Sequence, residues 1–131
     1  MTQEEFISIL DKKSYSYEIE GDRIVVTDKG GVYLRDLTSL PPGVEFKNKG
    51  DVVLFSLTYL PPDVVFKNKG DVYLDHLTSI SPGVEFKNEG DVQLDGLTIA
   101  IGGWFFDWKG NIEGIDSKRL LNKMIKDGVF I

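Results

Sequence analysis

The sequence has no cysteine and a single histidine, His76, among its 131 residues. The lack of cysteine excludes disulfides and thiolate metal sites, so a reducing compartment would do the protein no harm. One histidine on a repeated segment does not supply the partners of a Ser-His-Asp triad, and no glycine loop for phosphate is present. We therefore expect a protein that is not an enzyme and that uses no metal and no cofactor.

Long hydrophobic runs and an excess of positive charge are also missing. No apolar run approaches the roughly 18 residues of a membrane span, and the start MTQEEFISILDKK lacks the pattern of a signal peptide. The net charge is −6, from 15 Lys and Arg against 21 Asp and Glu, which argues against nucleic acid or an anionic membrane as partner. We expect a cytoplasmic protein of one domain, residues 1–131, whose charged partners are basic.

A 20-residue repeat dominates the rest of the chain. Residues 31–90 are three copies without insertion, GVYLRDLTSLPPGVEFKNKG, DVVLFSLTYLPPDVVFKNKG and DVYLDHLTSISPGVEFKNEG. A fourth copy starts at Asp91 and then diverges, while residues 23–30 match the second half of a copy. Units of this length stack and share a core, because one unit alone cannot bury enough apolar surface to fold.

Two short stretches of each copy alternate between apolar and other residues, as at 52–54 and 64–68. Such alternation is typical of strands, and the Pro and Gly residues around 61–63 and 69–70 are typical of corners between them. The sequence thus predicts a mainly β fold: a short parallel β-solenoid of about four coils with two strands per coil, stacked about 4.8 Å apart. We assign residues 31–110 to these coils.

Residues 1–30 are expected to cap the first coil. Thr2 and Glu5 have the spacing of a capping box, which predicts a helix over residues 3–12. Residues 15–19 and 23–27 are predicted to form two strands around a tight turn.

The last 21 residues, 111–131, are expected to cap the other end. Asp116 or Ser117 can begin a helix through residues 118–127, and Gly128 follows its end. The predicted apolar face of this helix comprises Leu120, Leu121, Met124 and Ile125. Between the repeats and this helix, IAIGGWFFDWKGNI is interpreted as a last coil thickened by aromatic residues, with Trp104 and Phe106 pointing inward beside Phe105 and Trp108.

Several polar residues recur every 20 positions, and we interpret these columns as structural. The columns are Asn48, Asn68 and Asn88; Asp51, Asp71 and Asp91; Thr38, Thr58, Thr78 and Thr98; and Lys47, Lys67 and Lys87. An inward Asn at a corner can pass hydrogen bonds from coil to coil, and Asp before a strand is an ordinary turn residue. The lysines alternate with Glu45 and Glu85, which favours a solvated face of mixed charge.

Coil two departs from its neighbours in the outward columns. It carries Val53, Phe55, Tyr59 and Val65 where the other copies mostly have charged residues or serine. An exposed apolar patch ringed by polar residues marks an interaction site, and Val65 would lie on the opposite sheet. The predicted partner-binding residues are Tyr33, Val53, Phe55, Tyr59 and Tyr73.

The phrase LTSLPPGVEFKNKGDVYL resembles the Leu-rich 20-residue repeats of bacterial effectors, and is more similar to repeat segments in small proteins of bacteriophages and other mobile elements. The resemblance covers residues 24–100. It implies a small inhibitor of a bacterial defence system, such as an anti-CRISPR protein, acting in the host cytoplasm. The function we expect is thus a non-enzymatic protein-binding module that blocks a surface of a defence complex.

Two alternatives stay open. The first is a carbohydrate-binding or carbohydrate-active solenoid that uses Tyr33, Tyr73 and the Asp column. The second is a structural protein that self-assembles into a homodimer through Phe55 and Tyr59.

Overall fold

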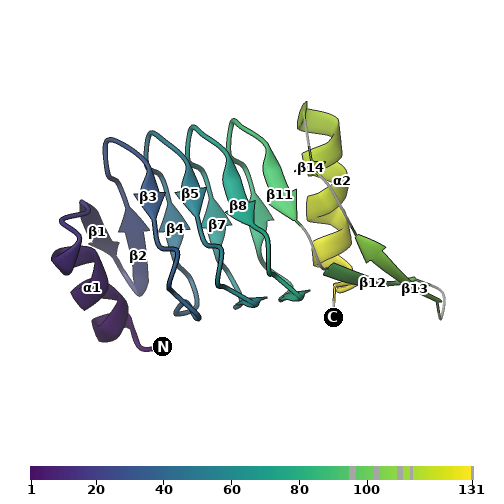
Figure 1. The fold of residues 1–131 in the computed structure, drawn as a ribbon, viewed down its shortest axis with the longest axis horizontal. Coiled ribbons are helices and arrows are strands. Elements are labelled where there is room, and N and C mark those ends of the chain that lie inside the picture. The colour runs from purple at the N-terminus through teal and green to yellow at the C-terminus, as the bar shows by residue number, and fades with distance from the viewer. Residues whose placement is uncertain (95–96, 102–103, 109–110, 113, 131) are drawn as a thin grey trace.

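The computed structural model describes residues 1–94, 97–101, 104–108, 111–112 and 114–130, with 98–101, 104–108, 111–112 and 114–117 described by their backbone. Its body is a row of stacked coils with helix α1 (Gln3–Lys12) at one end and α2 (Gly114–Lys126) at the other (Figure 1). The predicted parallel β-solenoid of about four coils, with a helix at each end, is confirmed.

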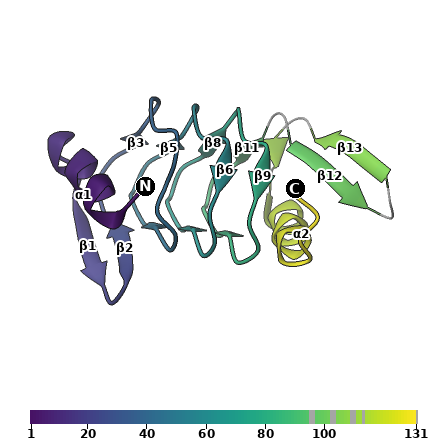
Figure 2. The ribbon, with the colours of Figure 1, turned by 90° about the horizontal axis from the view of Figure 1, so that it is seen from below.

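Each of the three complete coils, residues 31–90, supplies one strand to each of two five-stranded sheets. Sheet A has the order β1-β2-β4-β7-β10, and its members are β1 (Tyr17–Glu20), β2 (Arg23–Val26), β4 (Glu45–Phe46), β7 (Val65–Phe66) and β10 (Glu85–Phe86). Sheet B has the order β14-β11-β8-β5-β3, and its members are β3 (Val32–Tyr33), β5 (Val52–Val53), β8 (Val72–Leu74), β11 (Val92–Leu94) and β14 (Asn111–Ile112). Coils two and three add a third, short parallel pair, β6 (Tyr59–Leu60) with β9 (Ser79–Ile80), visible in Figure 2.

The coils stack with an offset of 20 residues. Parallel pairing joins Phe46 to Phe66 and Phe66 to Phe86, and their rings stack with centroids 5.2 and 4.9 Å apart. One hydrophobic core runs through the coils from Phe6 of α1 to Ile125 of α2. Identical residues on successive coils therefore fill the interior as continuous columns, as the repeat predicts.

The asparagine column ties each coil to the one before it. The buried Asn68 Nδ2 donates to the carbonyl oxygens of Gly50 (3.1 Å), Gly70 (3.2 Å) and Asp71 (3.2 Å). Asn48 and Asn88 repeat this pattern one coil away on either side. The predicted ladder is confirmed, and it adds a second donor to corner carbonyls that already accept from a backbone N–H of a neighbouring coil.

The N-terminal cap has the predicted parts. Thr2 Oγ1 accepts from Glu5 N at 3.1 Å while Glu5 Oε1 accepts from Thr2 N at 3.2 Å, so the capping box that begins α1 is formed. Strands β1 and β2 form an antiparallel hairpin whose turn contains Gly21 at φ +63°. A hydroxyl group closes the free edge of β3: Tyr33 N donates to Tyr15 Oη at 3.0 Å.

Helix α2 closes the free edge of β10 with side chains. The carboxamide of Asn122 accepts from Phe86 N at 2.7 Å and donates to Phe86 O at 2.9 Å, as a peptide group of a further strand would do. The buried Lys118 Nζ donates to Asn88 O and, at 2.6 Å, to Gly90 O. Burial lowers the pKa of Lys118, and the Asp91 carboxylate opposes that shift.

Helix α2 differs from its prediction in two respects. It begins at Gly114, before the predicted start at Asp116 or Ser117. Leu121 and Ile125 are buried and Met124 packs against the core, but Leu120 is 56% exposed and does not belong to the apolar face. On the side of α2 that meets the last coil, Lys118 and Asn122 bond to backbone groups of that coil. Polar residues therefore belong to the contact face, and a search for apolar residues at helical spacing does not find them.

Residues 97–108 do not continue the solenoid, so the interpretation of this segment as a last coil is wrong. Strands β12 (Leu97–Ile101) and β13 (Trp104–Trp108) pair antiparallel with each other, and β14 pairs antiparallel with β11. Figures 1 and 2 show this hairpin beyond the last coil, at the α2 end. The copy lacks the Pro corner of the other coils and has Gly-Gly between two β-prone runs, which favours a hairpin. The predicted inward direction of Trp104 and Phe106 lies outside the described residues.

On sheet A, Glu45 is almost fully buried and pairs with Lys67 (3.2 Å), Lys47 (3.3 Å) and Arg23 (3.9 Å). Burial alone would raise the pKa of Glu45, but hydrogen bonds from the two lysines outweigh it, so the pKa is lowered. Val65, expected to be exposed, is only 8% exposed. It lies in register between Glu45 and Glu85, whose longer side chains flank it.

Replacing Asn68 by Ala should lower the free energy of unfolding by about 1 to 3 kcal/mol, because a buried carboxamide that bonds to three corner carbonyls on two coils is lost. Chemical denaturation would measure this change. The exposed neighbour Lys69→Ala is the matched control and should stay within about 0.5 kcal/mol of the wild type. Equal effects of the two substitutions would contradict the structural role of the ladder.

Replacing Asn122 by Asp should destabilise the α2 end by about 1 to 3 kcal/mol. The carboxylate can still accept from Phe86 N, but it repels Phe86 O instead of donating to it. Amide hydrogen exchange of Phe86 and Lys87 should be faster in Asn122→Asp than in the wild type. The exposed Lys123→Ala serves as the control on the same helix, and unchanged exchange in Asn122→Asp would refute the edge-capping role.

Replacing Glu45 by Gln should cost about 1 to 2 kcal/mol at neutral pH, since the charged hydrogen bonds from the lysines are weakened. A lowered carboxyl pKa stabilises the fold above its usual value near 4.5, and that stabilisation is lost as the pH falls through the lowered pKa. The difference from wild type should therefore shrink near pH 3. Unfolding curves at both pH values test this, with the half-exposed Glu85→Gln expected to be nearly neutral throughout.

Candidate functional site

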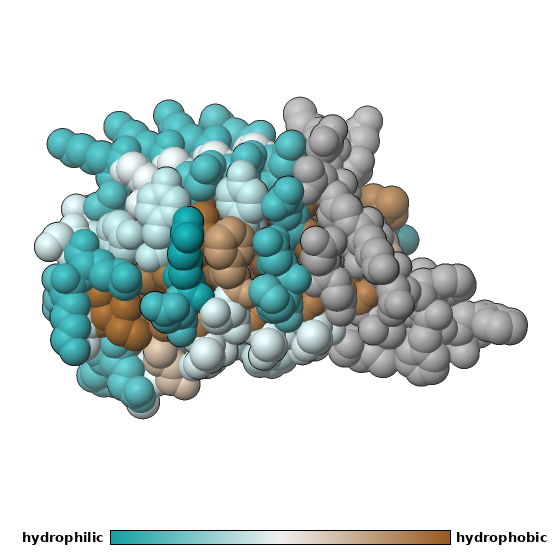
Figure 3. Space-filling model, viewed as in Figure 1, coloured by the Kyte–Doolittle hydropathy of each residue, from teal (hydrophilic) through white to brown (hydrophobic). Residues whose placement is uncertain are grey.

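The outer side of sheet B carries a cluster of aromatic side chains, which we call the aromatic face and define as Tyr33, Arg35, Phe55 and Tyr73. Parallel register places Tyr33 and Tyr73 on either side of Val53, one coil away each. Figure 3 shows hydrophobic surface in the middle of the stack with hydrophilic surface around it. The structure thus brings together four of the five predicted binding residues, Val53 included.

The members of the aromatic face contact one another across coils. The Phe55 and Tyr73 rings meet edge to face, with centroids 6.1 Å apart and planes at 72°. The Arg35 guanidinium lies 5.5 Å from the centre of the Phe55 ring, in cation-π geometry. Arg35 was not among the predicted binding residues. The sequence could have identified Arg35, because it occupies the same position in copy one that Phe55 occupies in copy two.

Val53 is only 4% exposed, so its predicted exposure is wrong. A valine is shorter than the tyrosines that flank it in register, and these larger side chains cover it. Val53 therefore supports the aromatic face from below, whereas the half-buried Phe55 and the 47% exposed Tyr33 remain accessible.

Tyr33 lies against the backbone of Gly31. A Cβ atom at Gly31 would come within 2.7 Å of Tyr33 Oη and 2.8 Å of its Cε2 and Cζ atoms. Coils two to four have aspartate at this position, and Gly31 is the exception. The missing side chain lets the Tyr33 ring lie close to the sheet, which gives this end of the face a flat aromatic surface.

The aspartate column borders the aromatic face and is used by the backbone. Asp51 Oδ1 accepts from Asp71 N at 2.7 Å, and Asp71 Oδ1 accepts from Asp91 N at 2.8 Å. Asp71 Oδ2 also accepts from Tyr73 Oη at 3.2 Å. Partial burial, the Asp71 charge and this hydrogen bond raise the pKa of Tyr73. These contacts agree with turn residues more than with paired catalytic acids.

His76 lies at the border of the aromatic face. Its Nδ1 is 2.6 Å from Phe55 O, and since a carbonyl only accepts, Nδ1 carries the proton. The side chain is exposed, as predicted. This bond ties the turn of coil three that contains His76 to the backbone of coil two.

Tyr59 does not join the aromatic face. It is 46% exposed, but it belongs to β6 in the separate short pair and its hydroxyl bonds with Ser81 Oγ. The predicted set of five residues therefore divides into a sheet B cluster and one isolated tyrosine.

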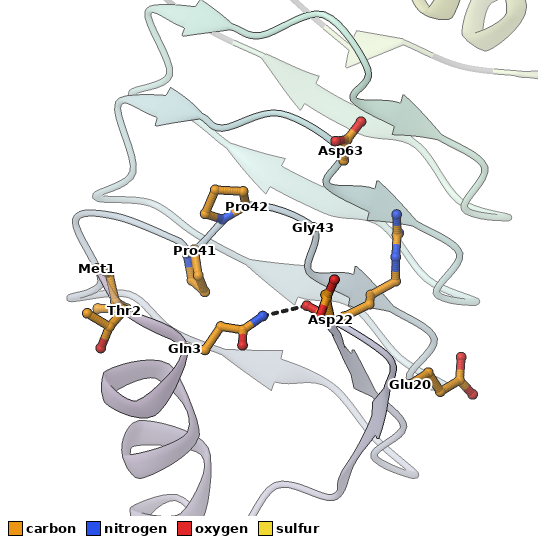
Figure 4. Close-up of a pocket in the computed structure, with 10 residues that line it drawn as sticks. Met1, Thr2, Gln3, Glu20, Asp22, Pro41, Pro42, Gly43 and Asp63 are labelled. Carbon is orange, nitrogen blue, oxygen red and sulfur yellow. Dashed lines mark hydrogen bonds between the residues drawn. The ribbon is translucent and has the colours of Figure 1, made fainter.

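A cavity of about 660 Å³ lies at the N-terminal end of the molecule, between the start of α1, the β1–β2 turn and the proline corner of coil one. Figure 4 shows Gln3 bonded to the carbonyl of Asp22 beside Pro41, with Asp63 on the next coil. Its lining combines Glu20, Asp22 and Asp63 with Arg23, so charges of both signs border the cavity.

Among the described residues, no three His, Asp or Glu side chains assemble as a metal site. The helices in the same part of the chain lack the length and hydropathy that crossing a membrane requires.

Comparison with known proteins adds nothing to this geometry: the chain matches no family model, no curated protein and no solved structure.

Proposed function

We propose that this protein is a non-enzymatic binding module whose aromatic face docks onto a protein partner. The observation that carries the proposal is the contact of Arg35 with Phe55 across two coils, on a hydrogen-bonded sheet that also presents the exposed Tyr33. Tyrosine and arginine, with large aromatic side chains, are the residues that most often dominate binding energy at interfaces.

The scaffold suits this role for an energetic reason. The strands that hold the aromatic face are tied to each other by backbone hydrogen bonds such as Leu34 N to Val53 O and Leu54 N to Tyr73 O. Residues held this way lose little conformational entropy when they bind. Less of the contact energy of a preformed surface is therefore offset by ordering, and more of it contributes to affinity.

The charge around the aromatic face suggests the character of the partner. Asp36, Asp51, Asp71 and Asp75 lie on the same coils, and the whole chain carries a net charge of −6. A partner with an apolar centre and a basic rim complements this surface and would be steered towards it.

The specific role we propose is inhibition of a bacterial defence system, such as CRISPR-Cas, by covering a surface of the defence complex. Its support is the resemblance of the repeat phrase to repeats in small bacteriophage proteins, together with the aromatic face. Steric blockade needs only binding, which agrees with a rigid module offering a flat cluster.

Carbohydrate binding is the second candidate, and one observation favours it. The Tyr33 ring lies close to Gly31 and is 47% exposed, which leaves surface for stacking on a sugar, and Tyr73 follows two coils away. A glycan array with wild type and Asp71→Asn separates the candidates: a glycan signal that Asp71→Asn loses favours this one, and the absence of any signal leaves protein binding.

Substituting Phe55→Asp and Tyr33→Ala together should abolish binding of the partner, because the double variant removes two of the three rings of the aromatic face and adds a charge at its centre. Capture from a bacterial lysate identifies the partner, and titration of the purified pair measures the loss, expected to be at least a hundredfold, or about 2.7 kcal/mol. The thermal midpoint should stay within a few degrees of the wild type.

Tyr59→Ala is the matched control, since it removes an equally exposed tyrosine outside the aromatic face and should bind as wild type does. In a strain with active CRISPR-Cas immunity, expression of wild type should restore phage plaques, and the double variant should not. Binding that survives the double substitution would remove the aromatic face as the docking site.

A further inference from the structure

The outer edge of β1 is open, in contrast to two other strand edges that the chain closes with side chains. The β10 edge is closed by Asn122 and Lys118, and the β3 edge by Tyr15. Within the described part of the chain, the outward backbone groups of β1 have no such partner. An unpaired edge is a template for a further strand.

The pairing of β2 identifies which groups of β1 are free. Val26 O accepts from Lys47 N on the next coil, so the backbone of Val26 points towards β4 and away from β1. Val26 lies opposite Tyr17, and Ile24 lies opposite Ile19. Because antiparallel pairs alternate, Tyr17 and Ile19 direct their N–H and C=O groups outward.

The side chains of this edge alternate in chemistry. Ile19 is 55% exposed, although it lies on the same side of the sheet as the buried Ile24. Glu18 and Glu20 are exposed and lie on the other side. In Figure 4 the Glu20 carboxylate points away from Gln3 and Pro41, to the outside of the hairpin.

The charges of Glu18 and Glu20 indicate whether the strand that pairs with the β1 edge is a second copy of this chain or a segment of a different protein. Antiparallel pairing of two copies of β1 sets Glu18 against Glu18 or against Glu20, and like charges directly opposite each other are destabilising. An added strand with Lys or Arg opposite Glu18 and Glu20 is stabilised instead, because the opposite charges attract. Asp22, in the turn after Glu20, is also exposed and adds negative charge at this end of the hairpin.

We propose that the β1 edge binds an extended segment of a partner protein with a basic-apolar-basic pattern, which adds to sheet A as a further strand. The apolar residue covers Ile19, and the basic residues meet Glu18 and Glu20. Backbone groups of Tyr17 and Ile19 supply the hydrogen bonds, as in other cases of strand addition. This surface is separate from the aromatic face and does not depend on its role.

The test uses the whole protein and the peptide Lys-Val-Lys-Val-Lys-Val, with Lys-Lys-Lys-Val-Val-Val as the control of equal charge and composition. The alternating peptide should slow hydrogen exchange of the Tyr17 and Ile19 amides, and the control peptide should not. Ile19→Pro removes an outward donor without removing a bond to β2, and should weaken binding at least about tenfold. Ile19→Val should bind as the wild type does.

A second variant, Glu18→Lys with Glu20→Lys, covers the case in which proline perturbs the fold. It keeps the backbone edge, should weaken the alternating peptide at least about tenfold, and should gain affinity for Glu-Val-Glu-Val-Glu-Val. Equal protection by both lysine peptides, or none at Tyr17 and Ile19, overturns the proposal. A wild-type dimer in sedimentation that Ile19→Pro converts to monomer also overturns it, since a second copy would then be the occupant.

Discussion

In-register stacking of identical coils is the constraint on which the rest of the structure depends. Every strand of the coils is only two or three residues long, and none could persist in isolation. Each gains stability from the backbone bonds and the side-chain columns that it shares with the coils on either side. A position in the sequence becomes a place on a surface only because the offset between coils is constant.

The sequence predicts what repetition dictates. Columns such as Phe46, Phe66 and Phe86, the asparagine ladder and the corners with positive φ at Gly43, Asp63 and Gly83 all follow from copying one unit. The terminal helices are also predictable, because a capping box and a following glycine are local signals. The binding role of the exposed aromatic residues stays a prediction, although their clustering across coils could be read from the same offset.

The sequence does not predict the structure where a copy departs from the repeat, or the exposure of a residue that larger neighbouring side chains cover. The exposure of Val53 depends on Tyr33 and Tyr73, whose sizes matter only once the register is known. The β12–β13 hairpin replaces a coil because the corner residues are missing. The same missing residues are also compatible with an irregular coil, so the sequence does not distinguish the two structures. The match of Asn122 to Phe86 joins residues 36 apart and has no local signal.

The carboxamide of Asn122 meets Phe86 as though one more copy followed, so α2 recognises the end of a coil rather than a particular coil. Any copy ending in the same backbone conformation would present the same two groups to it. Gain or loss of whole 20-residue units by slippage in the gene could therefore lengthen or shorten the array while the same terminator still fits. Such changes would alter the distance between the acidic hairpin and the C-terminal helix in steps of one coil, about 4.8 Å each.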